Sequence, residues 1–141
     1  HLDLTDAELK KIVVSHSGVL SCNHDSVVKK LKLQQECLGY TDEEMRAAVI
    51  AQAMVLGYGK IEEKWALMNS GFAEEEGGQK LAALRRLGPR GLGVGLARLQ
   101  DRLADLEALL GRAPKASEWF RRLVMFTQAK WENALANHAR E

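Results

Sequence analysis

Basic residues gather in the second half of this chain. Residues 79–130 carry 11 Lys and Arg against 4 Asp and Glu, whereas residues 1–78 carry 8 against 13, within a net charge of +1. Arginine predominates in the basic part, and its fork-shaped guanidinium suits phosphate recognition. The asymmetry predicts a surface that faces a polyanion. The candidate nucleic-acid-binding residues are Arg85, Arg86, Arg90, Arg98, Arg102, Arg112, Lys115, Arg121, Arg122 and Lys130.

A second interpretation of these residues stays open. Charged residues are common on solvated helix faces, and Arg98 and Arg102 can pair with Asp101 and Asp105 along one helix. If the arginines instead bind phosphates, the affinity should fall steeply with salt.

No other group of residues has the spacing of a catalytic or metal site. Cys22 and Cys37, taken with His16 and His24, fit no zinc-finger or ribbon spacing. The histidines lack the Ser and Asp context of nucleophilic catalysis. The glycine-rich stretch 91–95 is similar to a phosphate loop but lacks a preceding strand and a following Lys-Ser/Thr. We therefore expect no catalytic residue, no metal and no cofactor, and a protein that is not an enzyme.

The composition favours one helical domain. The chain has 141 residues, of which 46% are hydrophobic and only 2 are proline, and its common residues are helix formers. It has no apolar run of about 18 residues, so we expect no membrane span. It opens on His1 and has no visible signal peptide, and its 2 cysteines make no disulfide framework.

A leucine ladder occupies the stretch from Pro89 to Gly111. Six leucines recur at alternating steps of three and four: Leu92, Leu96, Leu99, Leu103, Leu106 and Leu110. This spacing places them on one stripe of a helix, with Arg98, Asp101, Arg102 and Asp105 on the opposite side. The ladder is too short for a coiled coil, so its packing partner must come from the same chain.

The first two parts of the chain repeat one another. Thr5-Asp6-x-Glu8 returns 36 residues later as Thr41-Asp42-x-Glu44, and both patterns predict a capping box at a helix start. A second helix follows in each copy, over 26–38 and 61–70. These helices end at Gly39 and Gly71, each followed by an aromatic residue.

A third copy contains the leucine ladder as its second helix. Gly77 takes the place of the capping threonine, Pro89 stops the first helix, and Gly111 is the terminal glycine. A last amphipathic segment opens at Ser117 and breaks near Thr127. The tryptophans lie on helix stripes, which favours core packing, with the one near the chain's end also open to a partner contact: Trp65, Trp119 and Trp131.

These elements predict an all-α fold. We expect a right-handed or superhelical stack of helical hairpins, an α-solenoid, forming a single domain over 1–141. Its repeats cover about 4–39, 40–71 and 72–111, and a C-terminal cap covers 112–141.

Two motifs resemble the mitochondrial transcription termination factor (mTERF) family. The junction Leu38-Gly39-Tyr40-Thr41-Asp42-Glu43-Glu44-Met45 is similar to the family's Leu-Gly-x-Ser/Thr-x-Glu-Glu-Leu. Gly88-Pro89-Arg90-Gly91-Leu92, the leucine ladder and Leu110-Gly111 are similar to the second half of its repeat. The resemblance covers about residues 4–111.

The resemblance implies a non-enzymatic protein of an organelle that binds RNA or duplex DNA through a basic face. It implies a role in gene expression, either as a regulator or as a ribosome-associated subunit that stabilises rRNA beside ribosomal or other organellar proteins. The implied organelle is the mitochondrion, with the chloroplast as the alternative. A helical protein–protein interaction scaffold without nucleic-acid binding is the other function that stays open.

Overall fold

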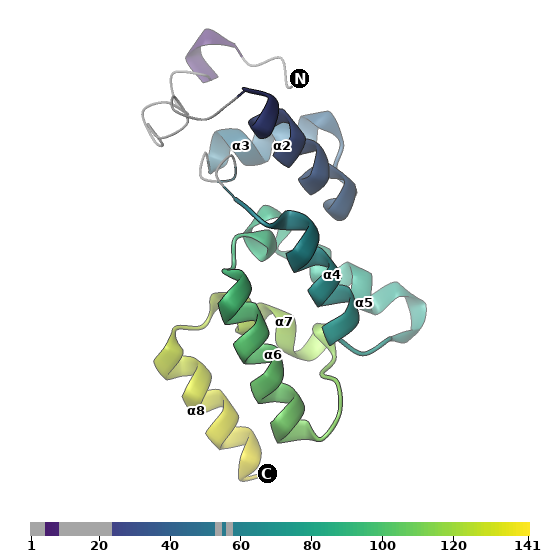
Figure 1. The fold of residues 1–141 in the computed structure, drawn as a ribbon, viewed down its shortest axis with the longest axis vertical. Coiled ribbons are helices and arrows are strands. Elements are labelled where there is room, and N and C mark those ends of the chain that lie inside the picture. Colours follow the sequence, from purple (N-terminus) through teal and green to yellow (C-terminus); the bar gives the residue numbers. More distant parts are fainter. Residues whose placement is uncertain (1–4, 9–23, 53–54, 56–57) are drawn as a thin grey trace. The chain divides into compact units, whose positions relative to one another are not determined.

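The computed structural model describes residues 5–8, 24–52, 55 and 58–141 (Figure 1). Every regular element among these residues is helical and none is a strand, which confirms the all-α expectation. The α-helices are α2 (His24–Leu38), α3 (Asp42–Ala51), α4 (Ile61–Gly71), α5 (Gln79–Arg86), α6 (Leu96–Leu110), α7 (Ala116–Met125) and α8 (Gln128–Ala139), and the 3₁₀ helices are η3 (Glu76–Gly78) and η4 (Gly88–Leu92).

The chain divides into two compact units, residues 1–62 (unit 1) and residues 63–141 (unit 2). The division falls in the first turn of α4. The expectation of one domain over 1–141 stays a prediction. The predicted helix break at Gly18 lies outside the described residues, as do His16 and Cys22.

Unit 1 contains both predicted capping boxes. The Thr5 hydroxyl accepts from the Glu8 amide at 3.2 Å, and the Glu8 carboxylate accepts from the Thr5 amide at 3.0 Å. Thr41 and Glu44 exchange the same two bonds at the start of α3, each 3.1 Å long. The two starts are linked, because Arg46 on α3 forms an ion pair with Glu8.

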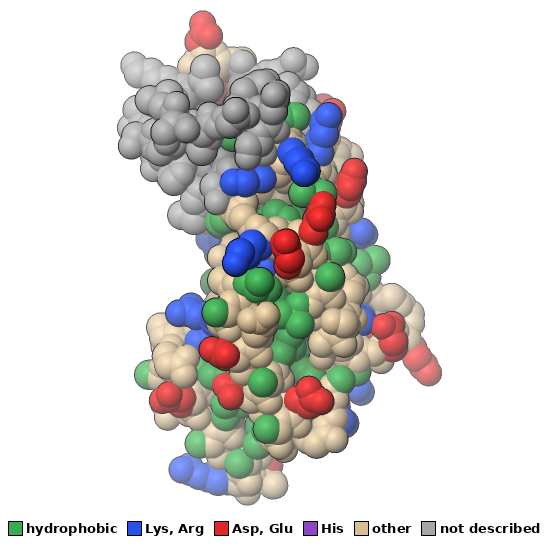
Figure 2. All heavy atoms as spheres, in the orientation of Figure 1, with side chains coloured by type: hydrophobic (Ala, Val, Ile, Leu, Met, Phe, Trp, Pro, Cys, Tyr) green, Lys and Arg blue, Asp and Glu red, His purple; other side chains and the backbone are tan. Residues whose placement is uncertain are grey.

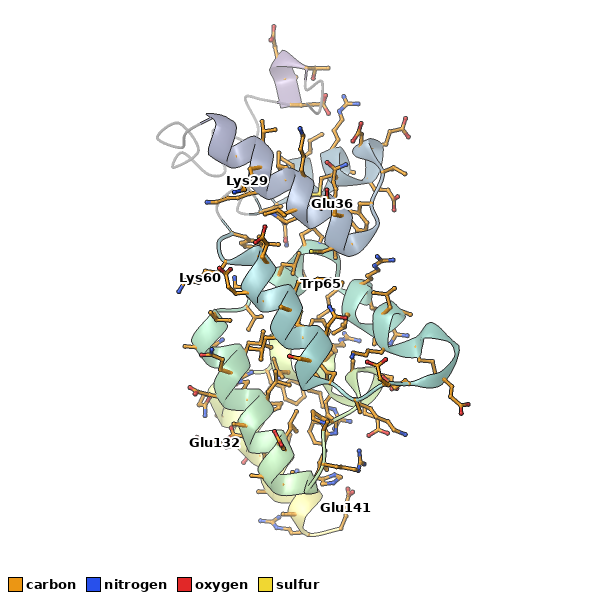
Figure 3. The ribbon with its side chains drawn as sticks, turned by 45° about the vertical axis from the view of Figure 1, so that its right-hand side comes forward. Lys29, Glu36, Lys60, Trp65, Glu132 and Glu141 are labelled. Carbon is orange, nitrogen blue, oxygen red and sulfur yellow. The ribbon has the colours of Figure 1, made fainter. Side chains whose placement is uncertain are left out.

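The core of unit 1 forms between α2 and α3. Leu31 on α2 packs with Met45 and Val49 on α3 and with Val55. The glycine that ends α2 was expected at Gly39, and it has the left-handed φ of +69° that a side chain disfavours. Polar residues such as Lys29 and Glu36 lie exposed on α2 (Figure 3).

The helices of unit 2 pack mainly through α7 and α6. α5 packs against α7, and α6 packs against both α7 and α8. Two contacts show that α5 and α7 run in the same direction. Glu75, just before α5, accepts from the Ser117 amide in the first turn of α7 at 3.3 Å, and Gly91, after the end of α5, lies against the Phe120 ring.

Leu92, which the ladder spacing placed on the same helix, lies in η4, because α6 begins only after its cap at Gly95; the other five leucines of the ladder lie on α6. Leu92, Leu99, Leu103 and Leu106 are buried, while Leu96 and Leu110 at the two ends of α6 are half-buried. The helix stops as expected at Gly111, which has a φ of +67°. The ladder therefore packs within its own chain.

Two glycines act differently from the sequence prediction. Gly78 rather than Gly77 is the N-cap of α5, and both have positive φ. Gly71 remains helical instead of taking a left-handed terminal conformation. A Cβ at Gly71 would lie 2.7 Å from Leu103 Cδ1, so this glycine allows the end of α4 to approach α6 closely.

A polar residue lies inside the buried stripe of α2, α4 and α6. In each helix it follows one buried apolar residue by three positions and precedes another by four, so all three lie on one side of the helix. The triplets are Leu31-Gln34-Leu38, Ile61-Lys64-Met68 and Leu99-Arg102-Leu106. We call Gln34, Lys64 and Arg102 the staple residues.

Each staple residue donates a hydrogen bond to a backbone carbonyl at or just after the end of the α-helix that comes next in the chain. Gln34 Nε2 donates to the Val55 carbonyl, after α3, at 3.0 Å. Lys64 Nζ donates to the Leu92 carbonyl, after α5, at 2.9 Å. Arg102 Nη1 donates to the Phe126 carbonyl, after α7, at 2.8 Å. The same connection thus recurs three times along the chain.

Candidate nucleic-acid interface

Several elements of unit 2 carry exposed basic residues. Arg102, in the middle of α6, bonds to the Leu123 and Phe126 carbonyls, so this part of α6 lies beside the end of α7. The contact between Gly91 and Phe120 places η4 against the middle of α7. We give the name basic end to the exposed cations that these elements carry around the α5–η4 connection and the α7–α8 turn. Its exposed residues are Arg86, Arg90, Arg98, Arg121 and Lys130, and Arg85 is half-buried there.

The opposite end of unit 2 contains acidic residues beside the basic ones. Arg112 and Lys115 lie exposed in the connection from α6 to α7. That connection contacts the acidic segment 73–76, because the Ala73 amide donates to the Pro114 carbonyl at 2.8 Å and Glu75 binds Ser117. Carboxylates there oppose the approach of a phosphate.

Arg102 is buried, unlike the other predicted residues. The leucine spacing predicted Arg102 on the side of α6 opposite the ladder, but its side chain is only 2% exposed. Its guanidinium donates to the Leu123 carbonyl at 2.7 Å and to the Phe126 carbonyl at 2.8 Å, and lies 5.0 Å from the Trp131 ring centre. Burial lowers its pKa, as does the charge of Arg98. Arg102 fastens α6 to the α7–α8 turn and has no access to an external phosphate in this structure.

The expected ion pairs along α6 do not form among the described residues, where the salt bridges involve other side chains. Asp105 instead accepts from Trp131 Nε1 at 3.2 Å. Arg98 and Asp101 are exposed. On the face shown in Figure 2, acidic and basic side chains are interspersed over unit 2.

The tryptophans have mainly packing roles. Trp119 and Trp131 are buried and meet edge to face with 6.2 Å between ring centres, which confirms their expected core position. Trp65 on α4 is half-buried (Figure 3). The full burial of Trp131 leaves it no surface for the partner contact that was also considered.

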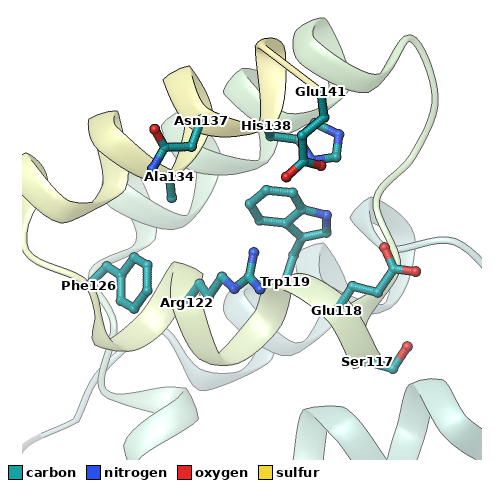
Figure 4. A pocket seen from close by; sticks show the side chains of 9 residues that line it. All are labelled: Ser117, Glu118, Trp119, Arg122, Phe126, Ala134, Asn137, His138 and Glu141. Atoms are coloured by element: carbon teal, nitrogen blue, oxygen red, sulfur yellow. The ribbon is translucent and has the colours of Figure 1, made fainter.

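An open groove separates α7 from α8 in unit 2 (Figure 4). Its volume is about 660 Å³. The Arg122 guanidinium lies in it, 5.1 Å from the Trp119 ring centre. Phe126 lines the end near the α7–α8 turn, and Glu118 and Glu141 line the other end. Arg122 thus belongs to the groove rather than to the basic end.

The burial of two lysines was not predicted from the sequence. Lys64 is 6% exposed and Lys80 is 7% exposed. Lys80 Nζ donates to the Asn69 carbonyl at the end of α4 and to Glu74. The spacing of apolar residues around each lysine could have indicated this burial. A cation three or four residues from buried apolar residues lies on the same inner stripe of its helix.

Sites of other kinds do not emerge from the described part of the chain. No group of three or more His, Cys, Asp or Glu residues there could hold a metal ion. Cys37 is half-buried. Among the same residues, no helix is both long and apolar enough to cross a bilayer.

Comparison of the chain with protein-family models, curated proteins and solved structures finds no match.

Proposed function

We propose that this chain is a non-enzymatic nucleic-acid-binding protein of the mTERF type, built as an α-solenoid, which binds RNA or duplex DNA through the basic end of unit 2. The proposal includes its work in organellar gene expression, in the mitochondrion or the chloroplast, as a regulator or as a ribosome-associated subunit. The organelle and the ribosome come from the sequence resemblance alone.

The recurring staple supports the solenoid. A stack of hairpins requires each repeat to contact the next in an equivalent way. The bonds from Gln34, Lys64 and Arg102 are such equivalent contacts, each one directed to the following hairpin. The third bond ends on α7–α8, so the cap at 112–141 behaves as a fourth, divergent hairpin.

One observation carries the binding proposal: five elements of unit 2 each carry an exposed cation. Arg86, Arg90, Arg98, Arg121 and Lys130 come from α5, η4, α6, α7 and α8. Phosphate contacts from several elements fix the register of a nucleic acid on a protein. Cations also favour the C-terminal ends of helices, but that effect does not account for Arg98 and Lys130, which lie near helix starts.

A matched pair of double variants tests the proposal. Arg86→Gln with Arg98→Gln changes the basic end, and Arg112→Gln with Lys115→Gln removes the same charge from the opposite end. Electrophoretic shifts on structured RNA and duplex DNA are measured over a salt series. We expect the basic-end variant to reduce the salt slope by about two on a duplex, since each lost phosphate contact removes about 0.9.

The outcomes separate the candidate functions. Equal losses in both double variants would show that net charge matters rather than a defined surface. If the unmodified chain gives no shift at low salt, nucleic-acid binding fails and the helical protein–protein scaffold takes its place.

A further inference from the structure

The groove between α7 and α8 is open at a position where the earlier hairpins carry a staple. Trp131 and His138 on α8 stand in the places of the two flanking residues, at the same spacing of three and four. The position between them is Ala134, which lines the groove and has no donor. A further hairpin packed here would lack the bond that Gln34, Lys64 and Arg102 supply elsewhere.

The groove has the size of a small-ligand site, and its lining combines aromatic rings with charged and polar side chains. Its volume of about 660 Å³ lies within the usual range for such sites, which combine apolar walls with a few polar groups. Figure 4 shows Phe126, Arg122 and Asn137 around one open space, with Trp119 beside it. An aromatic ring and an arginine plane are the groups on which proteins stack unpaired bases.

The charges give the groove a direction. Arg122 lies midway along the groove with its guanidinium beside Trp119, whereas Phe126 lines one end and Glu118 and Glu141 line the other (Figure 4). A phosphate is therefore favoured beside Arg122, on the side away from the two carboxylates. The Phe126 end adjoins the α7–α8 turn, and the exposed Arg121 and Lys130 lie on either side of that turn in the chain.

We infer that the groove binds one unpaired nucleotide of a nucleic-acid single strand, with its base against Phe126 and its phosphate beside Arg122. The inference rests on the proposed function and deepens it by distinguishing single strands from duplexes. A paired base has its faces covered by its neighbours in the stack and cannot enter. Asn137 lines the same groove and carries an amide that can form hydrogen bonds with the edge of a base.

The test compares neighbouring residues of α7. Arg122→Gln and Phe126→Leu alter the groove, and Phe126→Leu keeps the backbone carbonyl that Arg102 binds. Arg121→Gln is the matched control, because Arg121 is exposed one position away and does not line the groove. Binding is measured for a single-stranded RNA of about eight nucleotides, within the usual site sizes, and for the duplex formed with its complement.

We expect each groove variant to weaken single-strand binding about tenfold and duplex binding less than about twofold, as the loss of one stacked base predicts. Arg121→Gln should weaken both to a similar extent. Ultraviolet cross-linking of the single strand should label the peptide that contains Trp119 and Phe126. Circular dichroism and thermal melting check that each variant is folded.

Groove variants that leave single-strand binding unchanged, or that weaken strand and duplex equally, overturn the nucleotide site. The proposed function then still stands if the basic-end variants weaken binding. If neither strand nor duplex binds to the unmodified chain at low salt, both the groove site and the proposed function fail.

Discussion

The two units use the same staple position with different chemistry. In unit 1 the staple is the neutral amide of Gln34, which makes one bond to Val55 and leaves its buried Oε1 without a partner among the described residues. In unit 2 the staples are the cations Lys64 and Arg102. Arg102 alone binds two carbonyls and lies over a tryptophan ring.

The difference shows where a positive charge serves the fold. Carbonyls at the end of a helix carry partial negative charge and lack partners within the helix, so a buried cation can satisfy them. Part of the positive charge in unit 2 is used in this way. Only the exposed remainder is available to a polyanion, and a charge count along the sequence overstates it.

Loss of the Arg102 staple has the largest expected effect. Arg102→Ala leaves two buried carbonyls without a donor and removes the cover of Trp131. We expect the free energy of unfolding of unit 2 to fall by about 3 kcal/mol, given the usual strength of hydrogen bonds to charged groups. Arg98→Ala, one turn earlier and exposed, is the control and should cost less than about 0.5 kcal/mol.

The aromatic residues allow this measurement unit by unit. All 3 tryptophans lie in unit 2 and both tyrosines lie in unit 1. Tryptophan fluorescence during denaturant unfolding therefore reports unit 2. Equal costs for Arg102→Ala and Arg98→Ala would contradict a structural role for Arg102 and return it to the candidate interface.

The neutral staple should be easier to replace. Gln34→Met removes one hydrogen bond but also removes the unpartnered Oε1 from the core. Because the two effects oppose each other, we expect unit 1 to lose less than about 1 kcal/mol. Tyrosine fluorescence from Tyr40 and Tyr58 measures this change. A loss as large as that of Arg102→Ala would show that the two staples are energetically equivalent.

Acid should weaken unit 1 through Glu8. The hydrogen bond from Arg46, followed by that from the Thr5 amide, lowers the pKa of Glu8 from 4.5 to about 2. Because the pKa is lower in the folded state, the stabilisation is complete above pH 4.5 and disappears as the pH falls toward about 2. The carboxyl carbon of Glu8, followed by NMR, should titrate accordingly.

Arg46→Gln supplies the control for Glu8. Without the guanidinium, the Glu8 pKa should rise toward its ordinary value, while the capping bond to Thr5 remains. A Glu8 pKa that stays near 2 in this variant would assign the shift to the cap rather than to Arg46.

Local signals in the sequence predicted much of the fold. The capping boxes at Thr5 and Thr41, the stop before Pro89 and the break at Thr127 all depend on a few adjacent residues. Thr127 caps α8 by accepting from the Lys130 amide at 3.3 Å. Such features depend only on residues that are close in the sequence, so they can be predicted from it.

Long-range partners could not be predicted in this way. Arg102 has the charge of a surface residue, and only its place between Leu99 and Leu106 indicates the inner stripe. Its partners are backbone carbonyls 21 and 24 residues away. Every residue has such a carbonyl, so the residue types do not indicate which ones Arg102 binds. The candidate site was therefore predicted as a set of basic residues, without the division into exposed, groove and buried members.

The two glycines before α5 form a turn whose backbone conformation favours D-amino acids over L-amino acids. Gly77 and Gly78 have φ values of +65° and +71°, and a Cβ at either position would meet nothing within 4 Å. The obstacle to a side chain there is chirality rather than space. A D-alanine, introduced by chemical synthesis, would suit the turn and restrict the unfolded chain, whereas L-alanine would be strained.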